Sequence, residues 1–153
     1  MIEYVHEKVD DVVNEITPIL EEHWEEVAVN KEVIKLNPDF NAYRTLETAG
    51  NLALFTARDE GVLVGYFVVI ANYNPHYKDH IFAINDVIYL KPEYRGTMVG
   101  SELISYAEKR LKEAGTSVLV INTKTHIPFD SVLSRLGYTH VENTYSKVLK
   151  EEI

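Results

Sequence analysis

Apolar residues recur at helical spacing in the first third of the chain. Between residues 9 and 27 they return every three or four positions with acidic residues between them, which predicts an amphipathic helix. Pro18 falls inside this pattern and is expected to interrupt or kink the helix. A short strand over residues 2–5 is expected before it. A second helix is predicted from Asn37 as the N-cap to Gly50 as the stop, with a proline in its first turn.

The spacing changes to that of strands in the middle of the chain. Residues 52–58 and 62–71 are rich in β-branched and aromatic side chains, and Asp-Glu-Gly between them predicts a hairpin turn. Residues 81–90 form another predicted strand, with Asp86 on the same face as Ile88 and Leu90. The polar residues 72–80 are expected to be a loop.

The last third alternates again between the two patterns. A helix over residues 97–114 is predicted to lead into a short apolar strand, residues 118–121, buried on both faces. A helix beginning at Pro128 and a final hairpin, residues 138–141 and 145–149, complete the chain. The predicted order is β-α-α-β-β-β-α-β-α-β-β. This order describes an α/β (α+β) fold with a mixed, mostly antiparallel sheet flanked by helices.

Length and composition limit the class of protein. A chain of 153 residues without linkers or repeats predicts one domain spanning residues 1–153. The chain has no cysteine, so a thiolate nucleophile and a cysteine-based zinc site are excluded. It has no apolar run of membrane-spanning length and no signal-peptide features at its start. We therefore expect a cytoplasmic protein that does not bind membranes.

The net charge of −9 is concentrated near the N-terminus. Residues 1–50 contain twelve acidic and four basic residues, a balance of −8. Nucleic acid is an unfavourable partner for such a chain, because phosphate binding needs a basic face. The acidic third is either a solvated helix surface or a field that attracts a cationic substrate.

A predicted phosphate site follows the strand that ends at Leu90. A turn carrying Gly96 and Gly100 leads directly into a helix, whose first amides have no partner within the helix. Such a corner attracts phosphate groups, and Arg95 adds positive charge. The segment lacks the Gly-Lys-Ser/Thr of a Walker loop and the third glycine of the dinucleotide-binding fingerprint.

The same segment, Pro92-Glu93-Tyr94-Arg95-Gly96-Thr97-Met98-Val99-Gly100, resembles the motif Arg/Gln-x-x-Gly-x-Gly/Ala of the GNAT N-acetyltransferases. Arg95 and Gly100 match its ends, whereas Met98 replaces its middle glycine. Ser134-Arg135-Leu136-Gly137-Tyr138 is similar to the C-terminal signature of that family. The resemblance extends over nearly the whole chain, and the chain looks most like small stand-alone members, of the kind that bacteriophages often encode.

The resemblance implies that the chain binds acetyl-CoA, without a metal. The backbone of Ile88 and Leu90 would pair with the pantetheine arm as an added strand does. His126 stands where the family often has an asparagine that touches the pantetheine; its other interpretation is a polar loop residue. The pyrophosphate would be bound by the turn and the first turn of the helix, residues Arg95, Gly96, Thr97, Met98, Val99, Gly100 and Ser101.

The implied reaction is acetyl transfer from acetyl-CoA to a primary amine, and a cationic amine is the favoured kind of acceptor. Because dimers are common in the family, a second copy of the chain is also a candidate partner. The ammonium, with a pKa of about 10.4, must lose a proton before it attacks. Asp86 is the candidate base, the alternative being an aspartate that caps a loop. Tyr145 is the candidate acid, because Leu133 stands where the family often has tyrosine. Met98 and Leu133 also leave open a non-catalytic GNAT fold that binds CoA or a protein.

His76, Asp79 and His80 are the other cluster with ligand chemistry. They lie close together in the sequence but have no further matched ligand. A solvated turn is the simpler interpretation, and no metal site is predicted.

Overall fold

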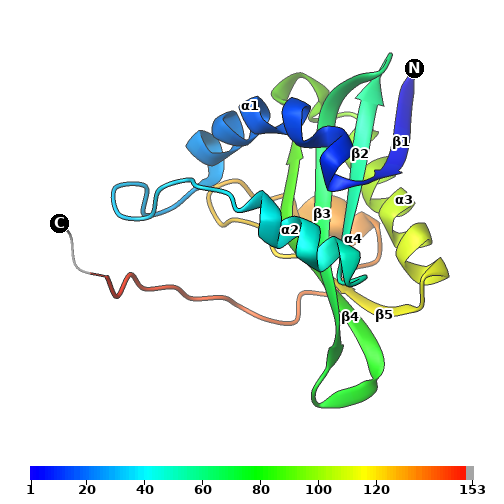
Figure 1. Cartoon of the computed structure of the whole chain (residues 1–153). Helices are drawn as coiled ribbons and strands as arrows, with labels where there is room; N and C mark the ends of the chain where they lie inside the picture. The colour runs from blue at the N-terminus through cyan, green and yellow to red at the C-terminus, as the bar shows by residue number, and fades with distance from the viewer. Residues whose placement is uncertain (151–153) are drawn as a thin grey trace.

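A computed structural model describes residues 1–150 of the chain. Its centre is a five-stranded sheet in the order β1-β2-β3-β4-β5, in which only the last pair of strands is parallel. Helices cover both faces of this sheet (Figure 1). The predicted fold class, a mixed and mostly antiparallel sheet flanked by helices, is thereby confirmed.

The first part of the chain forms an edge strand of the sheet and two helices that cover one of its faces. Strand β1 (Ile2–Glu7) leads into helix α1 (Val9–Val27), and helix α2 (Phe40–Thr48) follows after a long loop. Apolar residues of α1 pack on the sheet at helical spacing; those that are buried are Val9, Val12, Ile16 and Ile19.

This region differs from the prediction at two points. Pro18 does not interrupt helix α1, which continues through it to Val27, and the neighbouring Thr17 hydroxyl donates a hydrogen bond to the Val13 carbonyl at 2.6 Å. The N-cap of α2 is Asp39 rather than Asn37, because the Asp39 carboxylate accepts the Ala42 amide at 3.0 Å.

The central strands are longer than the sequence predicts. Strand β2 (Leu52–Asp59) forms a hairpin with β3 (Val62–Asn74), and β3 forms a second hairpin with β4 (Tyr77–Leu90). The predicted loop 72–80 is therefore mostly strand, with pairing up to Asn74 and Tyr77. This end of the hairpin projects beyond the helices (Figure 1), so its side chains are polar although its backbone is paired.

A β-bulge in β4 changes the direction in which Asp86 points. Val87 pairs with Val68 and Asn85 pairs with Val69, so Asp86 is the extra residue between them. The predicted face, which grouped Asp86 with Ile88 and Leu90, is wrong because the bulge reverses the alternation at this position. Asp86 points toward α2.

The second half of the chain covers the other face. A short 3-10 helix (Pro92–Tyr94) precedes helix α3 (Val99–Glu113), which packs through Leu103, Ile104 and Ala107 on the sheet. Strand β5 (Thr116–Val120) and helix α4 (Asp130–Arg135) follow. The prediction that this strand is buried on both faces was wrong, because Ser117 and Val118 are exposed. Strand β5 is an edge strand, paired along one side only among residues 1–150.

The predicted final hairpin does not form within the chain. After α4, residues 138–149 run in an extended conformation without strand pairing and lead away from the body of the protein (Figure 1). The last two strands of the predicted order are therefore absent from residues 1–150. Their sequence is suited to a strand, but among the described residues, 1–150, no strand pairs with them.

Gly65 allows β3 to approach β4 closely where β4 ends. A Cβ atom at this position would lie 2.8 Å from Leu90 Cδ1 and 3.0 Å from the Tyr89 carbonyl oxygen. Gly65→Ala is expected to lower the free energy of unfolding by about 1–3 kcal/mol, the usual cost of overpacking. Urea unfolding measures this change. Adding Leu90→Ala should recover part of the loss, and an unchanged stability of Gly65→Ala would contradict the close approach.

Candidate active site

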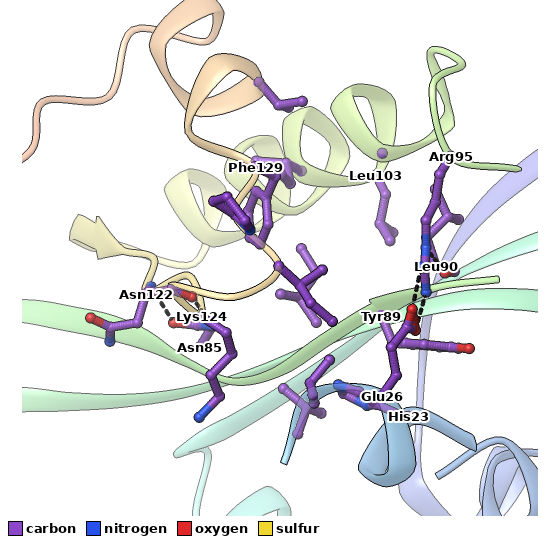
Figure 2. Close-up of a pocket in the computed structure, with 18 of the residues that line it drawn as sticks. His23, Glu26, Asn85, Tyr89, Leu90, Arg95, Leu103, Asn122, Lys124 and Phe129 are labelled. Carbon is purple, nitrogen blue, oxygen red and sulfur yellow. Dashed lines mark hydrogen bonds and ion pairs between the residues drawn. The ribbon is translucent and has the colours of Figure 1, made fainter. Parts of the chain in front are cut away.

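A cavity of about 520 Å³ opens between the two helical layers, along the end of β4. Its walls come from the second half of α1, from β4, from the turn into α3, and from the loop between β5 and α4 (Figure 2). Most of the lining is apolar, and its charged residues are Glu26, Asp86, Arg95 and Lys124. A cavity of this kind, mostly apolar with a few polar groups, is typical of a small-molecule site.

The cavity exists because β5 leaves β4 before β4 ends. The two strands pair only from Ile81 to Ile84 on β4, although β4 continues to Leu90. At the point of separation, the Asn85 side chain bonds to both backbone groups of Asn122: it donates to the carbonyl at 3.1 Å and accepts from the amide at 2.8 Å. This contact holds the opening of the sheet in place.

The free edge of β4 presents the backbone of two predicted residues. The Lys91 amide donates to the Val64 carbonyl at 2.9 Å, on the β3 side. Since backbone groups of an antiparallel strand alternate between its two sides, those of Leu90 and Ile88 point to the free edge. Both residues line the cavity, so an extended ligand arm can pair with them.

The turn into α3 forms the second wall. Gly96 adopts φ +78°, a conformation that favours glycine, and Gly96 and Thr97 line the cavity. Gly100 and Ser101 also line it, in the first turn of α3, where amides lack partners within the helix. A Cβ at Gly100 would reach only Leu90 Cδ2, at 3.8 Å. The glycine is therefore not required by packing against neighbouring residues, and the space beside it is open to a ligand.

Arg95 lies across this end of the cavity and is already paired. Its guanidinium forms an ion pair with both carboxylate oxygens of Glu26 on α1 and donates to the Leu90 carbonyl at 2.9 Å (Figure 2). It also lies over the Tyr89 ring, 5.3 Å from the centroid. The sequence analysis expected free positive charge for phosphate here. The structure instead uses the Arg95 side chain to connect α1 with the turn.

Asp86 lines the other end of the cavity, beside α2. Its carboxylate accepts a hydrogen bond of 2.6 Å from the Tyr43 hydroxyl and is exposed to solvent. Burial, together with the hydrogen bond to Asp86, raises the pKa of Tyr43, so the tyrosine remains a donor. This bond fixes the position of Asp86 and leaves lone pairs of its carboxylate free to accept a proton.

His23 lines the cavity and was missed by the sequence analysis. Its side chain is only 7% exposed, its Nδ1 atom is hydrogen-bonded to the Tyr66 hydroxyl at 2.8 Å, and its ring stacks on Tyr89. Burial lowers its pKa to about 4, so the ring is neutral at pH 7. Its helical spacing could have indicated its burial, because Ile16, Ile19 and His23 follow one another on the buried face of α1.

Several predicted residues lie outside the cavity lining. Met98, the N-cap of α3, is 60% exposed, and Val99 packs in the core beneath α3. His126 is exposed in the loop before α4. Tyr145, the candidate acid, lies on the extended C-terminal segment and is exposed to solvent. It does not line the cavity that contains Asp86.

The acidic surface reaches the cavity at one residue only. Glu26 lines it and is neutralised by Arg95, whereas Glu21, Glu22 and Glu25 are exposed on the outside of α1. Residues 1–150 contain no cluster of three potential metal ligands. In the same part of the chain, none of the helices has the length and hydropathy required to cross a membrane.

Fold and site define a class of enzyme. The sequence profile of the Acetyltransferase (GNAT) family matches residues 11–129, which include the free β4 edge, the turn and α3. The chain therefore belongs to the GNAT acetyltransferase family. None of the curated protein sequences compared with it matches significantly.

Solved structures share this fold at low sequence identity. A ribosomal-protein-alanine N-acetyltransferase from Brucella melitensis biovar Abortus 2308 has a TM-score of 0.69 at 20% identity, with 99% of each chain covered. Glucosamine-6-phosphate N-acetyltransferase from Arabidopsis thaliana has a TM-score of 0.74 at 10% identity, covering 98% of this chain and 99% of the other. A predicted acetyltransferase with acetyl-CoA from Clostridium acetobutylicum has a TM-score of 0.72 at 13% identity, with 97% of each covered. These likenesses show the fold alone.

The burial of His23 predicts a loss of stability in mild acid. Its pKa is about 4 in the folded protein and about 6.5 in an unfolded chain, so the unfolded state binds more protons between these values. Stability contributed by the neutral ring is present above pH 6.5 and is lost as the pH falls toward 4. Between pH 7.5 and pH 5 the loss is about 2 kcal/mol.

Denaturant unfolding at the two pH values measures this effect. His23→Gln removes the titrating group, so its stability should fall by about 2 kcal/mol less than that of the wild type over the same interval. Comparing pH dependences, rather than absolute stabilities, separates titration from the packing cost of the substitution. Equal pH dependences would show that His23 is solvated.

Proposed function

We propose that the protein transfers an acetyl group from acetyl-CoA to a primary amine. The observation that carries the proposal is the free edge of β4 leading directly to the glycine-containing turn before α3. An extended arm with an amide backbone and a terminal pyrophosphate matches these two features in order. Two proteins of similar structure, the Brucella and Arabidopsis N-acetyltransferases, support the same reaction class.

The backbone would contribute most of the binding to CoA. Ile88 presents its amide and carbonyl along the free edge, and Leu90 presents its amide, since its carbonyl accepts from Arg95. Gly100 and Ser101 present first-turn amides at the helix N-terminus, where phosphate groups are favoured. Arg95 adds little direct charge, because Glu26 holds it. Acetyl-CoA would supply the thioester acetyl group, and this chain would supply its alignment.

Asp86 is proposed as the base that accepts the proton of the acceptor ammonium. Tyr43 holds its carboxylate at the mouth of the cavity. Proton transfer there, directly or through water, leaves a neutral amine that forms the new C–N bond as the C–S bond breaks. Thiols have a pKa near 8.5, so the departing sulfur needs little acid assistance. The second N–H proton that the amine loses as the amide forms passes through water to the departing sulfur, so the step needs no Tyr145 beside the thioester.

The acceptor is proposed to combine an amine with an apolar body. Leu20, Trp24, Val27, Leu36 and Phe129 line the cavity near its charged groups. A cationic acceptor would be attracted to Asp86, because this carboxylate, unlike Glu26, has no basic side chain bound to it. The wider acidic surface of α1 would then act by attraction from a distance, which salt screens.

Gly100→Val tests the binding mode. A branched side chain in the first turn of α3 would occupy the space beside Leu90, so the affinity for acetyl-CoA is expected to fall at least tenfold. Isothermal titration with acetyl-CoA measures it. Ser105→Val is the matched control, because it places the same side chain on the exposed face of the same helix. Equal affinities of the two variants would contradict binding at this turn.

Asp86→Asn tests the chemical role. Turnover should fall by roughly 10²–10⁴-fold, the usual contribution of a positioned base, while acetyl-CoA affinity stays within about twofold. Release of free CoA thiol with a panel of primary amines measures turnover. Asp79→Asn, an exposed aspartate on the same strand, is the control. Tight acetyl-CoA binding by the wild type without turnover of any amine would favour the non-catalytic alternative.

A further inference from the structure

Four charged side chains line the cavity, and two of them pair with each other. Arg95 binds Glu26, so the charges of these two residues cancel. The other two are Asp86 and Lys124, and among residues 1–150 neither of them forms an ion pair. A mostly apolar cavity therefore keeps one negative and one positive group available to a ligand.

The two available charges lie at the same end of the cavity. The contact between the Asn85 side chain and the Asn122 backbone joins β4 to the loop after β5 at this end. Asp86 directly follows Asn85, and Lys124 comes two residues after Asn122. Figure 2 shows Lys124 beside these two asparagines, on the opposite side of the cavity from the ion pair with α1. A single small molecule at this end can therefore contact both charges.

The loop after β5 holds the backbone of Lys124 in place. The Ile127 amide donates to the Lys124 carbonyl at 3.1 Å, and the Thr123 hydroxyl donates to the Asp130 carboxylate at 3.1 Å. The charge of Lys124 also acts on the α1 wall: burial is the main cause of the lowered pKa of His23, and the positive charge of Lys124 adds to it. An ammonium group placed in this way is a donor for an anionic group of a ligand.

We propose, on the basis of the acetyl-transfer function proposed above, that the acceptor is a free amino acid with an apolar side chain. Its carboxylate binds Lys124, and its ammonium faces Asp86. Its side chain lies against the apolar part of the lining, to which Trp24, Leu36 and Phe129 belong.

Charge complementarity distinguishes this acceptor from other amines. An amino acid satisfies both Asp86 and Lys124, whereas a simple amine leaves Lys124 without a partner and a second ammonium group would be repelled by it. The first residue of a peptide has a neutral amide in place of the carboxylate, so a peptide amino terminus lacks this contact as well.

Matched acceptors test the role of Lys124. Phenylalanine, phenylalaninamide and phenethylamine share the amine and the ring, but only phenylalanine has a carboxylate; leucine and methionine with their amides extend the series. Release of CoA thiol gives kcat/KM for each acceptor. The ratio of kcat/KM for the acid to that for the amide should fall roughly 10- to 100-fold in Lys124→Met, the usual effect of losing a hydrogen bond to a charged group.

Two further variants sharpen this test. Lys124→Glu should reverse the preference, so that phenethylamine becomes a better acceptor than phenylalanine. Lys109→Met removes the same charge from the exposed face of α3 and is the control, which should keep the wild-type ratio. Equal ratios in the wild type and Lys124→Met would overturn the proposal.

Direct titration separates failure of this proposal from failure of the proposed function. Isothermal titration of the acids and amides into the protein, alone and with CoA, should show tighter binding of the acids to the wild type but not to Lys124→Met. If the acids bind in this way and no amine is acetylated, the proposed function is wrong and the amino-acid site stands. No binding of any amino acid would overturn the proposal. A loss of acetyl-CoA affinity in Lys124→Met would also overturn it, because Lys124 would then bind the cosubstrate.

Discussion

The separation of β5 from β4 is the constraint on which the site depends. If the two strands stayed paired to the end of β4, the backbone of Ile88 and Leu90 would be used within the sheet. The contact between the Asn85 side chain and the Asn122 backbone ends the pairing, and it satisfies backbone groups that the separation would otherwise leave unpaired. One residue further along, the bulge turns Asp86 toward α2. Two adjacent residues therefore produce both features: Asn85 ends the strand pairing and opens the edge for a ligand arm, and Asp86 places the carboxylate.

The ion pair between Arg95 and Glu26 sets the opposite end of the cavity. It connects α1 to the turn before α3, two segments far apart in the sequence that both line the cavity. Tyr89 lies beneath the guanidinium and beside His23, which joins the ion pair to the buried part of α1. The pair also removes the charge of both residues from the cavity. In the proposed complex, phosphate groups would therefore be bound by the backbone, which is less sensitive to the exact side chains of the turn.

Local signals account for what the sequence predicted correctly. The strand, the glycine-containing turn and the helix around residues 90–101 are consecutive, so spacing and residue type were sufficient. The direction of Asp86 was not predictable in this way, because a bulge needs only one extra residue and has no distinctive side chain here. Residues 72–80 carry no strand pattern, because this part of the β3–β4 hairpin projects into solvent, where the hydrophobic alternation disappears. His23 was missed because a polar residue on a buried helix face depends on its partners Tyr66 and Tyr89.

The departures from the family motif become understandable in the same terms. Met98 replaces a glycine, yet its side chain is directed to solvent, and what the turn offers a ligand is backbone. Leu133 stands where a tyrosine is common, and it packs against the core beneath α3. The first departure leaves binding possible, whereas the second removes a proton donor. A site of this kind can still promote acetyl transfer when the leaving thiolate is a weak base and the amine loses its proton to Asp86. In the proposed mechanism, turnover would then depend on the carboxylate on the bulge rather than on a tyrosine at the position of Leu133.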